Sequence, residues 1–539
     1  MSLKNATILL MLMTLLARFL GVGREMVIAW KFGASASSDA FFIAYSIPFA
    51  FYSIVGVSLT AVIVPILAEY DAAGETASGL RVASSALNIV VLISALLAGI
   101  GIVFSQRIAA VMGGNFPPAT LDLATHLTAL MIPTIVFMSM AGVVGGILNN
   151  YKIYIGPAAG PVLMNAIAIA SMVLADRMGI EAPVLGTVVG ALCYALCQIP
   201  GLRKVGFRYS LKIAVGDKTI RRIFTSTWSV MAVSCCYYAY NLTDFNLASG
   251  MPAGSITALN YATKFIQLPQ GLFTLAVTTV IFSPLSAYAA RNEFDNVRMM
   301  LEKGIRAILL MAVPCSAALL VVGGSVMMIL FQHGRFDASA TEMSTRTLIF
   351  LTVGLAGFCL NLPLIRCFYA LGKQRIPLMI AMASIPIKIG LSLKLGEIMM
   401  ERGLALATSL TYIINAVVMV VMLRRFLPGL LGRAFGAFAL RLSAASTAML
   451  AVTWLIDSGL ALILPPTHLG VFVRLASVGA VAVATFGVFG FLFGIEELTG
   501  NLSRVVRWLV RFVPAPVRSL LRQKIILVDR LIHRTGGKR

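Results

Sequence analysis

Long apolar runs recur from one end of this chain to the other, and they constrain its fold more than any other feature. They lie near residues 7–30, 40–67, 84–106, 124–147, 157–175, 183–201, 222–244, 257–288, 306–330, 347–370, 376–396, 403–423, 435–463 and 469–494. Apolar runs of about 20 residues are typical of transmembrane helices. The chain is 59% hydrophobic and only 12% charged, whereas soluble domains carry about a quarter charged residues. The sequence therefore predicts an all-α polytopic membrane protein with about 14 transmembrane helices and short connections.

The positive charge is distributed unevenly between the two sides of the membrane. The formal net charge is +22. If the N-terminus is cytoplasmic, most of the 43 Lys and Arg fall in cytoplasmic connections or in the tail, and few, such as Lys31 and Arg107, lie outside. By the positive-inside rule, both termini are expected in the cytoplasm. The charge is then a topology signal, and we do not expect a nucleic-acid partner.

Neither the cysteines nor the histidines indicate a metal centre. All seven cysteines lie inside apolar spans, and the four histidines are scattered along the chain. Without a CxxC pair or a Cys/His cluster, we interpret the cysteines as small buried hydrophobic residues. The first apolar stretch has no cleavage signal and is expected to be a retained first helix.

Two parts of the chain resemble each other at an offset of about 220 residues, as expected of the internal repeats of transporters. SSDAFFIAYSIP at 37–48 leads into VPILAEY at 64–70, and ALNYATKFIQLP at 258–269 leads into FSPLSAY at 282–288. The alternative is a chance recurrence of aromatic-proline spans. The pattern predicts an N-terminal half over 1–201 and a C-terminal half over 222–427, joined by a basic cytoplasmic linker over 202–221.

The last segment, over 496–539, differs in composition from the rest. Arg504, Arg507 and Arg511 stand at helical spacing opposite apolar residues. Such basic amphipathic helices lie in the membrane interface, held by apolar burial and anionic lipids. Anchoring to anionic lipids is the main interpretation of this tail, and binding of a protein partner is the alternative.

Motifs of catalysis are absent from the sequence. The acids of the predicted outside connections are dispersed, without paired-carboxylate or metal-ligand spacing. Neither a GxSxG nor a GxxxxGK motif occurs. We therefore expect a transporter and not an enzyme.

Three cations inside the apolar spans are candidates for substrate binding. A cation at mid-membrane costs roughly 2.5–3.5 kcal/mol on insertion scales, so it normally faces a watery cavity or a partner. Arg18 and Arg24 lie on the first span, where Gly21 and Gly23 would permit a bend that brings them together. Lys264 lies in the duplicated region of the other half. Since arginine suits a diphosphate, the set predicts an anion site, with local ion pairing or snorkelling as the alternatives.

Five further residues have more than one interpretation. Asp39 either caps its own helix or takes part in gating. Asp244 could bind a coupling cation, or Lys388 could be its fixed counter-charge, which would make a bound Na⁺ unnecessary. Arg441 and Arg474 lie early in the last two spans, where they either mark a groove for a lipid or snorkel to the interface.

Several motifs resemble the MviN/MurJ family of lipid II flippases, a member of the multidrug/oligosaccharidyl-lipid/polysaccharide exporter superfamily. They are RFLGVGRE, FGASASSDAFFIAYSIP and VPILAEY near the start, then LNNYKIYIGPAAGPVLMN, ATKFIQLPQG, LFQHGRF and RCFYALGKQRIP. The resemblance runs from about residue 15 to about residue 400, and the count of about 14 spans agrees with the family through residue 494.

The resemblance implies a fold and a substrate. It implies two six-helix lobes around a central cationic cavity, with a lipid groove formed by two C-terminal helices over 428–495. The cavity cations of the family fall on Arg18, Arg24 and Lys264. A double arginine of the family is replaced by Tyr52 and Ser53, and Tyr52 could stack on a sugar.

The implied function is movement of an undecaprenyl-diphosphate-linked saccharide across the bacterial inner membrane by alternating access. Lipid II is the first expectation, and an exopolysaccharide or O-antigen unit is the alternative. A cation-coupled multidrug exporter is a second alternative, which predicts an acidic cavity. No cofactor is expected, while Na⁺, H⁺ or the membrane potential stay open as driving force. Cell-envelope glycan synthesis proteins are candidate partners.

Overall fold

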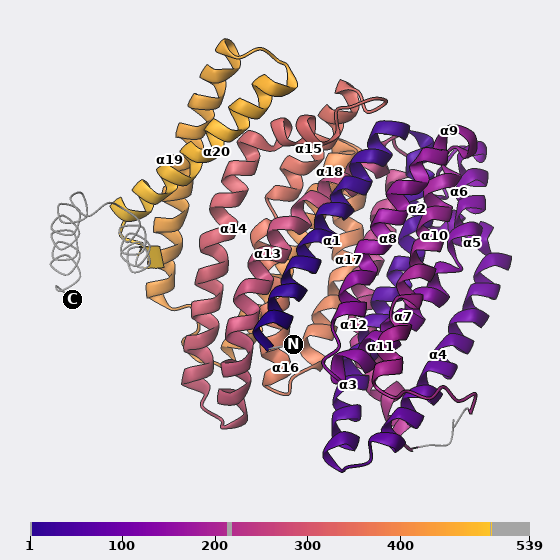
Figure 1. Cartoon of the computed structure of the whole chain (residues 1–539). Helices are drawn as coiled ribbons and strands as arrows, with labels where there is room; N and C mark the ends of the chain where they lie inside the picture. The colour runs from indigo at the N-terminus through magenta and orange to yellow at the C-terminus, as the bar shows by residue number, and fades with distance from the viewer. Residues whose placement is uncertain (1–2, 213–217, 496, 499–539) are drawn as a thin grey trace, which may run out of the picture. The chain divides into compact units, whose positions relative to one another are not determined.

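The regular structure of the described residues is helical throughout. The computed structural model describes residues 3–212, 218–495 and 497–498 (Figure 1). In chain order its elements are α1 Leu3–Phe32, α2 Ala36–Phe51, η1 Tyr52–Gly56, α3 Val57–Ala72, α4 Thr76–Val103, α5 Ser105–Gly113, α6 Pro118–Met131, α7 Thr134–Asn150, α8 Ile155–Ser171, η2 Met172–Leu174, α9 Ala175–Met178, α10 Glu181–Leu196, α11 Ile199–Lys204, α12 Lys218–Ala248, α13 Ser255–Ala290, α14 Phe294–Phe331, α15 Ala338–Thr352, α16 Leu355–Ala370, α17 Arg375–Met399, α18 Glu401–Arg424, α19 Arg433–Ile463 and α20 His468–Leu492. The element η1 is a π-helical turn, and η2 is a 3₁₀ turn.

These helices confirm the predicted class of an all-α polytopic membrane protein. Within the described ranges, 9 helical stretches are long and apolar enough to cross a membrane, or up to 11 if each of two bent pairs is one span. The other three predicted spans also fall on helices, namely α1, the run from α2 through η1 to α3, and α12. Hydropathy alone therefore locates the long helices of the described residues, whereas the short helix α5 was not predicted.

The chain forms two compact units. Unit 1 comprises Met1–Gln267, Leu330–Gly354 and Gln374–Asn415, and unit 2 comprises Leu268–Ile329, Leu355–Lys373 and Ala416–Arg539. The chain passes from the first unit to the second within α13. The lobes expected from the repeat, over 1–201 and 222–427, stay a prediction.

Small residues allow helices of unit 1 to pack closely. A Cβ atom at Gly160 of α8 would lie 1.7 Å from a ring carbon of Tyr194 on α10, and one at Gly190 of α10 would lie 2.9 Å from the Met164 carbonyl oxygen. Glycine is thus required on both sides of this crossing, because any side chain would separate the two backbones. Close backbone approach is a main source of helix association in membranes.

The basic linker packs against unit 1 where it is described. Ser210 accepts hydrogen bonds through its carbonyl oxygen from the Ser84 hydroxyl at 3.0 Å and the Asn88 amide at 2.6 Å. Just after the linker, Arg222 of α12 donates two hydrogen bonds to Glu69 of α3, at 2.7 and 2.9 Å, and these lower the pKa of the Glu69 carboxyl. The linker is therefore bound to α4, and the start of α12 is bound to α3. Apart from residues 497 and 498, the predicted amphipathic tail lies outside the described residues.

Candidate functional site

A cavity of about 660 Å³ lies within unit 1, between α2, α5, α12 and the first turns of α13. Its charged lining residues are Arg107 and Lys264, and no acidic side chain lines it among the residues described. Aromatic and polar side chains make up much of the remaining wall, including Phe42, Tyr45, Phe49, Tyr238, Asn241, Asn260 and Gln267. The cavity therefore combines positive charge with aromatic surface.

The predicted binding residue Lys264 lies in this cavity. It projects from α13, and its neighbour Thr263 also lines the wall. The oppositely charged Arg24 and Glu25 of α1 form an ion pair nearby, and no residue of α1 lines the cavity. Sequence analysis therefore identified one of the two lining cations.

Arg24 lies behind one wall of the cavity. It is only 4% exposed, and it contacts the Glu25 carboxylate at 2.6 Å and donates a hydrogen bond to the Tyr45 hydroxyl at 2.7 Å. Its guanidinium carbon is 4.5 Å from the centre of the Tyr45 ring, which stacks in turn on Phe49 at 4.1 Å. Since Tyr45 and Phe49 line the cavity, an aromatic layer separates the Arg24–Glu25 pair from it.

Arg18 and Arg24 are not brought together. The helix α1 runs unbroken from Leu3 to Phe32, so the bend expected at Gly21 and Gly23 does not open the helix. Both glycines face α8, where added Cβ atoms would lie 3.8 Å from Asn165 and 3.9 Å from Ile169. On an unbroken helix six residues correspond to about 600° of rotation, which separates the two arginines by about 240° in azimuth. Accordingly Arg24 is buried, and Arg18 is half-buried.

Tyr52 does not line the cavity. It lies in the π-helical turn η1 and packs against Met138, Met164 and Ala191. It also shares a side-chain hydrogen bond with Tyr194. The prediction that Tyr52 stacks on a sugar therefore has no support from its position, because its ring belongs to the packing between helices.

Asp39 caps a helix other than its own. Its carboxylate accepts hydrogen bonds from the Gly254 amide at 2.7 Å, and from the Thr257 amide and hydroxyl at 2.7 and 2.6 Å. The cap of α2 itself is Ser35. Asp39 is 2% exposed and therefore ties the start of α2 to the start of α13, the two helices of the duplicated element.

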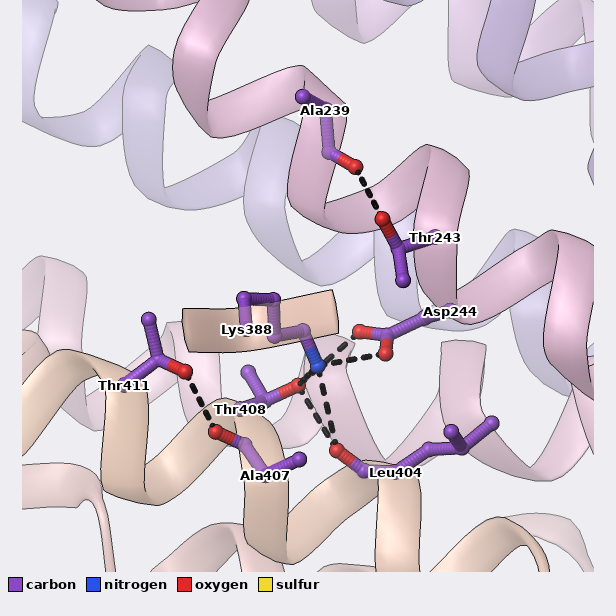
Figure 2. A network of polar contacts seen from close by, with 8 residues as sticks. All are labelled: Ala239, Thr243, Asp244, Lys388, Leu404, Ala407, Thr408 and Thr411. Atoms are coloured by element: carbon purple, nitrogen blue, oxygen red, sulfur yellow. Dashed lines mark hydrogen bonds and ion pairs between the residues drawn. The ribbon is translucent and has the colours of Figure 1, made fainter. Parts of the chain in front are cut away.

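Asp244 and Lys388 are brought into direct contact (Figure 2). The Lys388 ammonium lies 2.6 Å from the Asp244 carboxylate and 2.5 Å from the Thr408 hydroxyl. These residues come from α12, α17 and α18, all within unit 1. Lys388 is fully buried, and the side chain of Asp244 is 13% exposed. The pairing considered from the sequence is thus present in the structure.

Arg107 is a cavity residue that sequence analysis placed in an outside connection. It belongs to the short helix α5, and its guanidinium lies 5.6 Å from the centre of the Phe104 ring. No motif marks it, because the span prediction ends at residue 106 and gives no indication that the chain turns back toward the cavity. Its position depends on packing between helices that are distant in sequence.

Arg441 and Arg474 both have partners in unit 2. Arg474 on α20 forms a bidentate ion pair with the Asp457 carboxylate on α19, in which the Arg474 Nε atom lies 2.5 Å from one carboxylate oxygen. Arg441 donates a hydrogen bond to the Gly494 carbonyl oxygen at 2.9 Å. The helices α19 and α20 form a long hairpin (Figure 1), so both arginines strengthen this hairpin. Asp457 was not singled out from the sequence.

The helices and the cationic cavity define the chain as a polytopic helical membrane protein of the transporter class. A family model described as lipid II flippase MurJ matches residues 28–464. The chain belongs to this family, and is thus a multi-pass bacterial membrane protein.

Named relatives agree with this assignment. The lipid II flippase MurJ of Burkholderia cenocepacia is 30% identical over 380 residues, which cover 68% of this chain and 73% of the relative. The probable lipid II flippase MurJ of Vibrio cholerae is 29% identical over 421 residues, which cover 75% of this chain and 79% of the relative.

Solved structures agree in fold. A lipid II flippase MurJ in an inward closed conformation matches with a TM-score of 0.76 at 23% identity, over 91% of this chain and all of that one. An inward-facing multidrug resistance MATE transporter of the MOP superfamily matches with a TM-score of 0.62 at 14% identity, over 77% of this chain and 95% of that one. The fold is therefore common to exporters of different substrates, and the substrate must be argued from the cavity.

Proposed function

We propose that this protein moves lipid II, the peptidoglycan precursor, from the cytoplasmic to the periplasmic leaflet of the bacterial cytoplasmic membrane. Its family supports this function, as do relatives named as lipid II flippases. The observation that carries the proposal is the charge of the cavity, which has lining cations and no acidic lining residue among those described.

A diphosphate has the charge and geometry that this cavity would accept. Lys264 and Arg107 would contact its oxygens, while Arg24, paired with Glu25 behind Tyr45, would hold the aromatic wall in place. Charge-assisted hydrogen bonds are strong in a site of low dielectric constant. The aromatic residues Tyr45 and Phe49 offer flat surfaces to a sugar, while the polyprenyl chain would stay in the surrounding lipid.

The same charge disfavours an exporter of cationic drugs. Cations in an apolar cavity repel a cationic substrate, and this repulsion is weakly screened away from water. A flippase for another undecaprenyl-linked saccharide would share the diphosphate chemistry, so complementation must separate it from a lipid II flippase.

Alternating access would require the contact between α2 and α13 to open. With both termini in the cytoplasm, as the charge asymmetry predicts, Asp39 lies at the periplasmic end of α2. Its bonds to Gly254 and Thr257 would close this end of the cavity until they separate. The basic tail would hold the protein to anionic lipids on the cytoplasmic side.

Complementation of a conditional lipid II flippase depletion tests the function. We expect the wild-type chain to restore growth, and Arg24→Ala at matched expression to fail. Lys394→Ala is the control, because this lysine is exposed and lies away from the cavity. A wild-type chain that is well expressed in the membrane and does not restore growth would contradict a lipid II flippase.

A further inference from the structure

We propose that the Lys388 ammonium is a tethered cation that fills a monovalent-cation site, and that this site binds Na⁺ once the ammonium is removed. The consequence for ion coupling rests on the proposed transport function. The site itself does not, because its ligands are defined by the packing of three helices.

Three oxygen atoms of different chemistry converge on the ammonium (Figure 2). They are a carboxylate oxygen of Asp244 at 2.6 Å, the hydroxyl of Thr408 at 2.5 Å and the carbonyl oxygen of Leu404 at 3.4 Å. Carboxylate, hydroxyl and carbonyl oxygens are also the groups that hard metal cations prefer. The arrangement around the nitrogen is therefore that of a small cation site.

The ligands are also held in place without the ammonium. The Thr408 hydroxyl lies 3.0 Å from the second carboxylate oxygen of Asp244 and 2.9 Å from the Leu404 carbonyl oxygen. Thr408 and Leu404 are one turn apart on α18, and α12 supplies Asp244. Because Lys388 comes from a third helix, α17, its removal leaves the three oxygen ligands on their own elements.

The environment of the site favours a bound positive charge. Lys388 is completely buried and the Asp244 side chain is 13% exposed, so an unpaired carboxylate here would carry a desolvation cost. A cation beside Asp244 offsets that cost. Ser384 lies one turn before Lys388 on α17 and donates a hydrogen bond to the Asn415 side chain on α18. The interface between α17 and α18 therefore contains further polar groups next to the site.

A free Na⁺ ion does not fit while Lys388 is present, because the ammonium already contacts all three oxygens. The tether also prevents this cation from leaving the protein. An ion that cannot dissociate cannot be exchanged between the two sides of the membrane, so this site cannot couple transport to a Na⁺ gradient. Among the driving forces left open by the sequence, we therefore disfavour Na⁺ bound at Asp244.

Thermal unfolding of the purified full-length protein tests the site. Midpoints are measured in NaCl and in choline chloride at equal ionic strength for the wild type, Lys388→Ala, Lys388→Met and the double variant Asp244→Asn with Lys388→Ala. We expect Na⁺ to raise the midpoint of Lys388→Ala by about 2 °C or more, with a rise that grows with the logarithm of concentration. The other three proteins should not respond, because the ammonium, the methionine side chain or the loss of the carboxylate prevents binding.

Two outcomes would overturn the inference. One is a stabilisation of the wild type by Na⁺ that is lost in the double variant, which would mean that the ammonium does not fill the site. The other is a folded Lys388→Ala protein that does not respond, which would make the contact a structural ion pair only. Lys388→Ser provides a second variant with space for an ion if Lys388→Ala does not fold. None of these measurements depends on lipid II, so failure here is distinct from failure of complementation.

Discussion

At the scale of single residues, Arg24 and Glu25 form a buried pair whose members depend on each other. Each is less than 5% exposed, and their contact is 2.6 Å long. The Arg24 Nε atom and the second Glu25 oxygen have no hydrogen-bond partner among the residues described. The pair is therefore incompletely satisfied, which costs stability but leaves polar atoms beside the cavity wall.

Removal of Arg24 alone should destabilise the protein more than removal of both partners. We expect Arg24→Ala to lower the free energy of unfolding by about 3–5 kcal/mol, since it leaves the Glu25 charge buried and unpaired. Adding Glu25→Ala should restore much of the stability without restoring transport. Thermal unfolding and complementation measure the two effects separately. Equal stability of the single and double variants would show that the ion pair carries little of the energy.

Lys264 gives a prediction on substrate affinity. Lys264→Gln removes one charge-assisted contact of about 1.5–3 kcal/mol, which corresponds to a roughly 10- to 150-fold loss of affinity for a diphosphate lipid. Lys264→Arg should retain binding, because a guanidinium keeps the charge and can donate two hydrogen bonds. Binding of lipid II to the purified variants measures this. Unchanged affinity in Lys264→Gln would remove Lys264 from the site.

At the scale of elements, the contact of Asp39 with α13 predicts a local change in dynamics. Asp39→Ala should cost about 0.5–2 kcal/mol, the usual range for a lost helix cap, and should speed amide hydrogen exchange at Gly254 and Thr257. Asp337→Ala is the matched control, since Asp337 caps its own helix α15 through Ala340. Faster exchange at 254–257 in the control alone would contradict the assignment of the cap.

The elements were predicted far better from the sequence than their contacts were. Every predicted span falls on helices, because apolar length is a local property of the chain. The partner of a polar residue is not local. Asp39 was expected to cap α2 or to gate, and it caps α13, which lies more than 200 residues further along the chain.

The cavity shows the same limit. Lys264 was predicted because a cation in an apolar span costs free energy of insertion and therefore normally faces a watery cavity or a partner. Arg107 carries no such signal, since it follows the end of a span. Tyr52 was assigned by resemblance, and in the structure it is half-buried between helices and does not line the cavity. A charged residue within an apolar span can be recognised from the sequence. The direction in which a side chain points between packed helices cannot.

At the scale of the whole molecule, the tethered ammonium predicts how transport responds to ions. Collapse of the Na⁺ gradient with a Na⁺ ionophore should leave the rate of the wild type unchanged in proteoliposomes. Lys388→Ala should become sensitive to Na⁺, because it regains an exchangeable site. The lipid substrate and the membrane potential are held constant in both arms. A fall in the wild-type rate on loss of the Na⁺ gradient would mean that another Na⁺ site drives the cycle.

Lys388 also bears on how transport should respond to the salinity of the medium. A carrier that must bind Na⁺ from the medium loses activity when the medium is diluted. Here a side chain of the protein itself occupies the position beside Asp244. We therefore expect growth that depends on this protein to be insensitive to dilution of Na⁺ in the medium.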